Sequence, residues 1–186
     1  TDTPWFATDC LARWYAEEGR ERYPDTTELL ILADGGGSNR AGSYVWKYGL
    51  QTKLCNEFGL IVTVCHYPPG TSKWNPIEHR LFSQISKNWA GRPLESYETV
   101  LNYIRTTTTK SGLKVTASLI EGYYEKGMKV SQEQIEMLTI AAHTVQPKRN
   151  YTLYPQLVQD YEFSEVSCQR TGNNPLSLQK PEVIFA

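Results

Sequence analysis

Two acidic residues, Asp34 and Glu78, stand at positions where a pair of carboxylates could bind metal. Asp34 follows the apolar run 29–33 and precedes three glycines, while Glu78 opens a helical pattern beyond the apolar run 60–65. Hard divalent cations such as Mg²⁺ prefer carboxylate oxygens and water as ligands. Two such ions about 3.5–4 Å apart can stabilise the attacking and leaving oxygens of an in-line displacement at phosphorus. The pair is therefore a candidate for phosphodiester chemistry.

Each acid also has a purely structural interpretation. Asp34 followed by Gly35 is typical of a tight turn in which the carboxylate accepts local hydrogen bonds. Glu78 lies three positions after Asn75, a spacing that imitates a helix capping box. A glycine-rich phosphate loop is a further possibility, but the segment 35–37 belongs to neither a GxGxxG nor a GxxxxGK[ST] motif. The two acids become a convincing site only if the fold brings them together.

The elements around Asp34 predict such a fold. The runs 29–33 and 60–65 are apolar without helical periodicity and favour buried strands. Between them, residues 43–58 carry an apolar stripe at helical spacing, and Gly59 provides a stop signal. Strand, helix and strand form a βαβ unit with parallel strands and a crossover that is right-handed in about 98% of cases. Both strands then end at one sheet edge, where open parallel sheets bind ligands.

Glu78 belongs to a helix predicted to begin at Asn75 and Pro76, since proline is favoured at the first helical position. It precedes Leu81 and Phe82 by three and four positions, so we expect it on or beside the face toward the core. A carboxylate there needs a partner, and two anions in a low-dielectric cleft repel unless a cation bridges them. A divalent metal ion satisfies both requirements.

The remaining pattern predicts one domain, residues 1–155, followed by a tail or interaction arm, residues 156–186. A helix beginning at Ser96 is expected to pack against the sheet. The other predicted elements are a helix from a Thr8 cap to Gly19, a short helix capped by Ser131, and extended segments at 113–119 and 150–154.

Composition describes an ordinary globular chain of 186 residues, with 40% hydrophobic and 21% charged residues and a net charge of −1. Its apolar runs are far shorter than the roughly 18 residues of a membrane-spanning helix. The first residues do not form a secretory signal pattern, so we expect a cytoplasmic protein. The four cysteines contain no CxxC pair and predict reduced thiols, not zinc ligands.

Basic and aromatic side chains surround Glu78, although the net charge gives no global reason to expect nucleic acid. They could contact a phosphate backbone or stack on a displaced base, and a solvated helix face is the competing interpretation. His66 and His143 are assigned to structure. The candidate nucleic-acid contacts are Lys73, Trp74, His79 and Arg80.

Two long segments carry a family resemblance: LILADGGGSN at residues 30–39 and VCHYPPGTSKWNPIEHRLFS at residues 64–83. They resemble the Rhodopirellula-type DDE transposases of bacterial insertion sequences. The resemblance continues through NWAGRPL at 88–94, the threonine run at 106–109 and NYT at 150–152. It thus covers most of residues 1–155.

The resemblance implies a ribonuclease H-like fold, a three-layer α/β/α arrangement with a mixed sheet. It makes Asp34 the second and Glu78 the third acid of a triad that holds two Mg²⁺ or Mn²⁺ ions for DNA strand cleavage and transfer. The implied partners are DNA, as transposon ends and target, and further copies of the full-length transposase. A bacterial, nucleoid-associated setting is implied as well.

The first acid of the triad is expected on a strand upstream of the helix at 8–19. Asp2 and Asp9 both precede a helix, so we do not expect either to replace it. We therefore interpret the chain as a carboxyl-terminal fragment that lacks amino-terminal strands and does not catalyse transposition alone. The alternative is an inactive transposase remnant that binds DNA or a partner subunit without catalysis.

Overall fold

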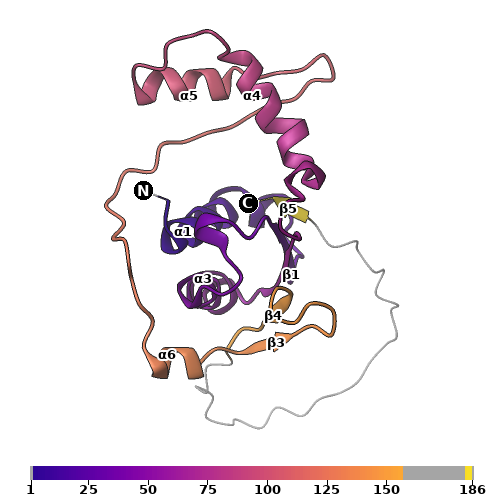
Figure 1. Cartoon of the computed structure of the whole chain (residues 1–186), viewed down its shortest axis with the longest axis vertical. Helices are drawn as coiled ribbons and strands as arrows, with labels where there is room; N and C mark the ends of the chain where they lie inside the picture. Colours follow the sequence, from indigo (N-terminus) through magenta and orange to yellow (C-terminus); the bar gives the residue numbers. More distant parts are fainter. Residues whose placement is uncertain (1, 157–182, 186) are drawn as a thin grey trace.

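A computed structural model describes residues 2–156 and 183–185. It contains a mixed five-stranded sheet in the order β3-β4-β2-β1-β5. Figure 1 shows helices α1 and α3 on one side of this sheet, and α4 and α5 in a separate arm above it. The fold is therefore mixed α/β. The second helical layer implied by the resemblance is not among the described elements, and the three-layer arrangement stays a prediction.

The centre is the predicted βαβ unit. Strand β1 (Glu28–Ala33) leads to helix α3 (Tyr44–Leu50), which continues as the π-helical segment η3 (Gln51–Asn56), and then to strand β2 (Ile61–His66). The two strands pair in parallel, with Glu28 opposite Ile61 and Ala33 opposite His66. The prediction of parallel strands that end together is confirmed.

The other strands extend the sheet on both sides. β4 (Tyr151–Leu153) runs antiparallel to β2, and β3 (Ile140–Ala142) runs antiparallel to β4. β5 (Val183–Phe185) pairs in parallel with β1. Part of the predicted tail is thus a strand, while residues 157–182 lie outside the described residues. The expected extended segment 150–154 is confirmed as β4, whereas 113–119 forms no strand.

The first helix starts earlier than predicted. Helix α1 (Pro4–Trp14) begins with proline at its first position, and Thr3 Oγ1 accepts a hydrogen bond from Phe6 N at 3.1 Å. It continues as the π-helical segment η1 (Tyr15–Gly19) and the short helix α2 (Arg20–Arg22). The prediction that Thr8 caps the helix is wrong, because Thr8 lies inside α1, fully buried against Gly49 of α3.

The hydrophobic core lies between the sheet and helices α1, α3 and η3. These elements, with β1 to β4, are called the α/β body below. Alternation along β1 and β2 places every second side chain in this core. The buried cluster consists of Leu11, Tyr15, Leu29, Ile31, Trp46, Leu50, Leu54, Cys55, Leu60, Val62, Val64, Tyr151 and Leu153.

The segment after β2 leaves the body. It contains the short 3-10 helix η4 (Ser72–Trp74), the π-helical segment η5 (Glu78–Phe82), α4 (Ser83–Asn88) and α5 (Tyr97–Arg105). α4 and α5 form the α4–α5 hairpin, in which Asn88 Nδ2 donates to Tyr103 O at 2.6 Å. The expected packing of α5 against the sheet is wrong: α5 has no buried residue and stands apart from the body (Figure 1).

Two smaller predictions are confirmed. Ser96 caps α5, and Ser131 caps the short helix α6 (Gln132–Glu136) through a capping box with Gln134.

No helix in the described ranges 2–156 and 183–185 is long and apolar enough to cross a membrane. Cys10, Cys55 and Cys65 carry free thiols, and burial raises the pKa of Cys55 to about 12. Cys168 lies outside the described residues.

Candidate metal and DNA site

Asp34 stands immediately after β1, at the start of a glycine-rich loop. Gly36 N donates to Asp34 Oδ1 at 3.0 Å, which is the local hydrogen bond expected of a tight turn. Gly35 and Gly37 have positive φ values of 77° and 48°, a conformation that side-chain-bearing residues rarely adopt. The Asp34 carboxylate remains exposed. It can therefore serve the turn and still present oxygen to a cation.

Glu78 begins η5, and its side chain is exposed. In the described part of the chain its carboxylate has no hydrogen-bond or ion-pair partner, so the capping box is not formed. Asn75 Oδ1 instead accepts from Ile77 N at 3.3 Å. The capping interpretation of Glu78 is wrong, and the carboxylate is free to bind a ligand.

The expected position of Glu78 on the core-facing stripe is wrong as well. That expectation used the spacing of an α-helix, but Glu78–Phe82 is π-helical, and hydrogen bonds in a π-helix join residues five apart. Phe82, four positions on, is itself 46% exposed, and η5 has no buried residue, so this turn does not face the core. Ile85, farther along, is the buried residue of this helix. Glu78 is exposed, so its carboxylate does not need a metal ion to compensate for burial. The case for a metal ion rests on where Glu78 lies in the chain after β2.

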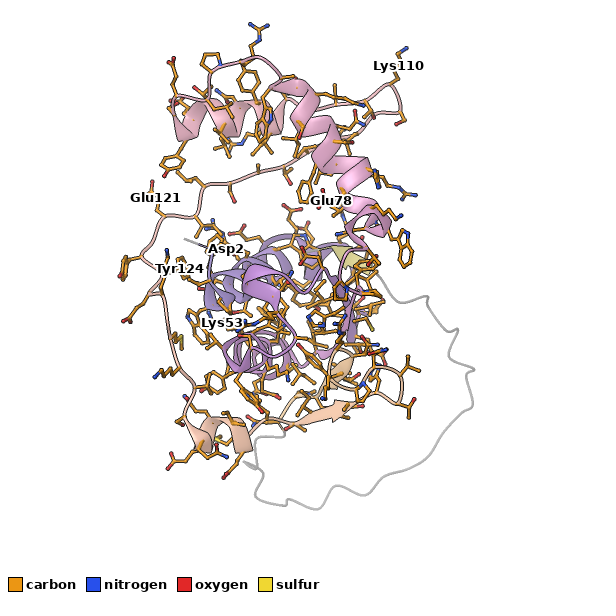
Figure 2. The ribbon with its side chains drawn as sticks, viewed as in Figure 1. Asp2, Lys53, Glu78, Lys110, Glu121 and Tyr124 are labelled. Atoms are coloured by element: carbon orange, nitrogen blue, oxygen red, sulfur yellow. The ribbon has the colours of Figure 1, made fainter. Side chains whose placement is uncertain are left out.

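Asp34 stands at the carboxyl edge of the parallel pair, and Glu78 follows β2 after the loop at residues 67–77. Ala33 is paired with His66, and Tyr67 N donates to Ala33 O at 2.8 Å. The two strands therefore end opposite each other. Asp34 is the next residue after Ala33. Figure 2 shows Glu78 at the base of the helix that rises from the body toward the α4–α5 hairpin. This edge is where parallel sheets bind ligands.

The loop between β2 and Glu78 is compact. Trp74 N donates to Thr71 O at 2.8 Å, and Thr71 Oγ1 donates to Pro68 O at 2.6 Å. A ring nitrogen of His79 lies 2.7 Å from Lys73 O, which joins the first turn of η5 to the preceding 3-10 turn. His79 is thus engaged in structure. The Trp74 side chain is 60% exposed, and Lys73 and Arg80 are also exposed.

His66, at the end of β2, has a structural role, as predicted, and its partners lie at this edge. It is 8% exposed, and its two ring nitrogens lie 2.5 Å from Arg149 O and 2.8 Å from Asn39 O. The sequence pattern of β2 already indicates that the His66 side chain is buried. Alternation from Val62 and Val64 places His66 on the buried face of β2, where a polar ring needs partners.

The two acids of the amino-terminal segment lie in different surroundings. Asp2 lies beside the glycine loop, since a Cβ on Gly37 would be 3.0 Å from Asp2 Oδ2. Asp9 is ion-paired with Lys53, whose ammonium lies 3.5 Å from the centre of the Trp5 ring. In the described ranges 2–156 and 183–185 no group of three or more His, Cys, Asp or Glu side chains could hold a metal ion.

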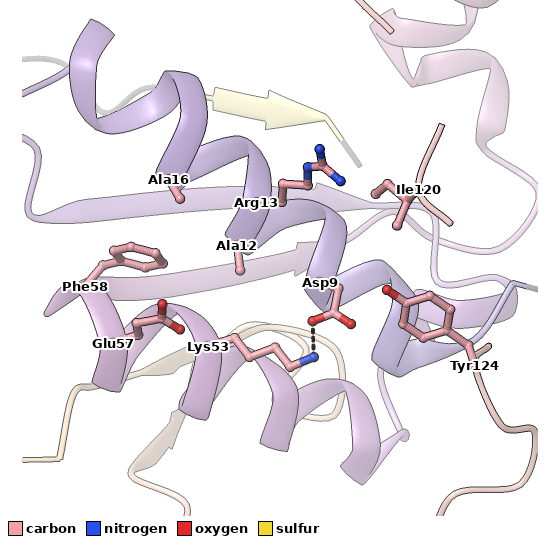
Figure 3. Close-up of a pocket in the computed structure, with 9 residues that line it drawn as sticks. All are labelled: Asp9, Ala12, Arg13, Ala16, Lys53, Glu57, Phe58, Ile120 and Tyr124. Atoms are coloured by element: carbon pink, nitrogen blue, oxygen red, sulfur yellow. Dashed lines mark hydrogen bonds and ion pairs between the residues drawn. The ribbon is translucent and has the colours of Figure 1, made fainter. Parts of the chain in front are cut away.

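A cavity of about 410 Å³ lies on the other side of Asp9, between α1, η3 and the returning segment at 120–124 (Figure 3). Burial and a hydrogen bond to Asp9 raise the pKa of Tyr124. Arg13 Nε pairs with Glu17 at 2.7 Å. The charged groups of the cavity are therefore largely paired with protein groups, and the cavity is separate from Asp34 and Glu78.

The sequence model of the Rhodopirellula transposase DDE domain matches residues 1–155. The chain belongs to this family. No curated protein and no solved structure matches the chain. Membership in the family of DDE domains supports a transposase function, with DNA as partner and divalent metal ions as cofactors. The exposed carboxylates of Asp34, at the carboxyl end of β1, and of Glu78, in η5, offer the oxygen donors that such ions prefer.

Proposed function

We propose that this DDE domain supplies Asp34 and Glu78, the second and third acids of the triad, for DNA strand cleavage and transfer. When bound, two Mg²⁺ or Mn²⁺ ions would activate the attacking oxygen and stabilise the leaving oxygen. Asp34 and Glu78 would hold these ions by their carboxylate oxygens, and neither would need to accept a proton. The proposal is supported by the parallel register of β1 and β2, which sets Asp34 at the carboxyl edge of the sheet, and by the exposed carboxylate of Glu78 in the segment that follows β2.

The proposal extends to the DNA contacts. Lys73 and Arg80 flank Glu78 and would neutralise phosphates, which positions a duplex without reading its sequence. Trp74 is the exposed aromatic residue beside them and offers a stacking surface for an unpaired base. His79 contributes by fixing the turn that carries Lys73. DNA would thus approach Glu78 from the side of η4 and η5.

We further propose that the fold is ribonuclease H-like. A parallel pair joined by a helical crossover, with an antiparallel strand on β2, supports it. Further copies of the transposase would assemble with it on the transposon ends. A crystal structure of a longer polypeptide in which helices cover only one face of the sheet would contradict the ribonuclease H-like fold.

Metal binding tests the two acids directly. The loss of free Mn²⁺ signal in electron paramagnetic resonance measures Mn²⁺ affinity for the 186-residue chain. Asp34→Asn and Glu78→Gln should each weaken binding by tenfold or more, because each removes a charged ligand. Asp25→Asn and Glu95→Gln remove exposed acids elsewhere and serve as controls. Equal affinities in all five proteins would refute the assignment.

The alternative is a DNA-binding module without catalysis, and the exposed cluster of Lys73, Trp74 and Arg80 favours it independently of the acids. Titration of labelled DNA at two salt concentrations, with and without Mg²⁺, distinguishes the two functions. Metal-dependent DNA binding that Asp34→Asn abolishes supports the catalytic assignment. Binding that depends on salt but on neither Mg²⁺ nor Asp34 supports the alternative.

A further inference from the structure

We propose that His66 is a positioning residue for Asp34, because its imidazole holds the loop at residues 35–39 against the turn between β3 and β4. The inference deepens the proposed function and rests on Asp34 being a metal ligand. It gives a role to a side chain that the sequence assigned only to structure.

The glycine-rich loop contacts the imidazole at both of its ends. At the start, Gly35 lies beside the ring, since a Cβ there would be in ordinary van der Waals contact with His66 Cδ2, at 3.5 Å. At the end, His66 Nε2 lies 2.8 Å from Asn39 O. Asn39 is buried, and its side-chain Oδ1 has no hydrogen-bond partner in the described part of the chain. The main-chain contact with His66 therefore anchors this end of the loop.

The opposite side of His66 is fixed to the body. Its Nδ1 lies 2.5 Å from Arg149 O, and its main-chain N donates to Asn150 Oδ1 at 3.2 Å. Both groups belong to the turn before β4, which pairs with β2. A carbonyl oxygen only accepts, so the imidazole donates through both nitrogens when it carries two protons and through one when it is neutral. The ring thus links two loops that share no strand pairing.

The loop in turn orients the carboxylate. Gly36, between the two contact points, donates its N–H to Asp34 Oδ1 and accepts from Asn39 N at 3.2 Å through its carbonyl. A shift of Asn39 is therefore transmitted through Gly36 to Asp34. Groups that orient a metal ligand typically change metal affinity by 10–100-fold when they are removed. At 8% exposure, His66 acts through the loop and does not touch DNA.

Two substitutions separate positioning from simple structural support. The amide nitrogen of Gln reaches about as far as Nε2, so His66→Gln keeps a donor toward Asn39 O and loses the one toward Arg149 O. The shorter His66→Asn keeps a donor near the place of Nδ1, toward Arg149 O, and loses the one toward the loop. Each variant keeps an amide donor at one of the two ring-nitrogen positions and loses the contact at the other, so a role in packing alone predicts similar effects on metal affinity.

The measurement is Mn²⁺ affinity of the full 186-residue chain, with circular dichroism and Tm to verify the fold and Asp34→Asn as reference. We expect His66→Asn to weaken Mn²⁺ binding about tenfold, while the Mn²⁺ affinity of His66→Gln stays close to that of the wild type. The decrease in Tm should be similar in the two variants. Equal affinities in the two variants would overturn the proposal, while a loss in Asp34→Asn alone would leave the proposed function intact.

A second readout covers the case in which Asp34→Asn binds Mn²⁺ like the wild type, an outcome that overturns the proposed function itself. Hydrogen exchange of the Gly36 amide reports the bond to Asp34 Oδ1 without metal. Faster exchange in His66→Asn than in His66→Gln supports the positioning of Asp34 by the ring. Equal exchange rates in the two variants overturn it.

Discussion

The α/β body and the α4–α5 hairpin both contain amphipathic helices, but the apolar faces of these helices are buried to different extents. In the body, Trp46, Leu50 and Leu54 are fully buried under the sheet. In the hairpin, α5 has no buried residue, and Tyr97 at its start is 79% exposed. An apolar stripe therefore indicates that a helix has a face to cover. Whether that face is covered depends on what the rest of the chain places opposite it.

The largest expected difference concerns two tryptophans. Trp46→Ala removes a fully buried ring from the body and should lower the free energy of unfolding by about 3–5 kcal/mol. Trp74→Ala removes a ring that is 60% exposed and should change stability much less. Urea unfolding followed by circular dichroism measures both. Similar losses in the two variants would mean that the body and its surroundings do not differ in packing.

The contact between α1 and α3 is the next test of the body. A Cβ on Gly49 would overlap the side chain of Thr8, and the two helices would have to move apart. Gly49→Ala should therefore destabilise the protein by about 1–3 kcal/mol, as overpacked cores do. Gly42→Ala is the matched control, since no atom lies within 4 Å of its added methyl group. An unchanged Tm in Gly49→Ala would refute this close approach.

A smaller effect should be confined to the hairpin. Ser96 Oγ accepts from Thr99 N at 3.1 Å and caps α5. Ser96→Ala should lower the local stability of α5 by about 1 kcal/mol. Hydrogen exchange should become faster for amides in α5 while protection in β1 and β2 stays constant. A parallel loss of protection in the strands would show that the hairpin and the body unfold together.

The smallest effect is expected at the uncovered face of α5. Tyr97→Ala should change the free energy of unfolding by no more than about 0.5 kcal/mol, which is usual for exposed positions. Urea unfolding of the isolated chain measures it, with the buried Tyr151→Ala as the contrasting variant. A loss above about 1 kcal/mol for Tyr97→Ala would mean that this face is covered in solution.

The sequence predicts the body well because its signals are local. Apolar runs without helical periodicity at 29–33 and 60–65, separated by a helical stripe, determine a parallel pair once the crossover rule is applied. The position of Asp34 follows from this pairing alone. The start of α1 was missed because Thr8 satisfies the same capping rule as Thr3. Pro4 distinguishes them, because proline is favoured at the first helical position and marks Thr3 as the cap.

The rest of the site depends on information that single-chain patterns do not contain. The spacing to Leu81 and Phe82 placed Glu78 beside a core-facing stripe, but Phe82 is 46% exposed and η5 has no buried residue. His66 was visible as a buried position, but its partners Asn39 and Arg149 come from loops far apart in the sequence. The exposure of α5 likewise depends on the path of the chain after β2.

The order of strands has a consequence for how much the chain can vary. β2 pairs with β1 on one side and with β4 on the other, and the whole α4–α5 hairpin is inserted between β2 and β4. The entropy lost on closing a loop grows only with the logarithm of its length, about 0.6 kcal/mol for each doubling. The hairpin can therefore lengthen, shorten or acquire new recognition surfaces during evolution, while the pairing that holds Asp34 is maintained at almost constant free energy.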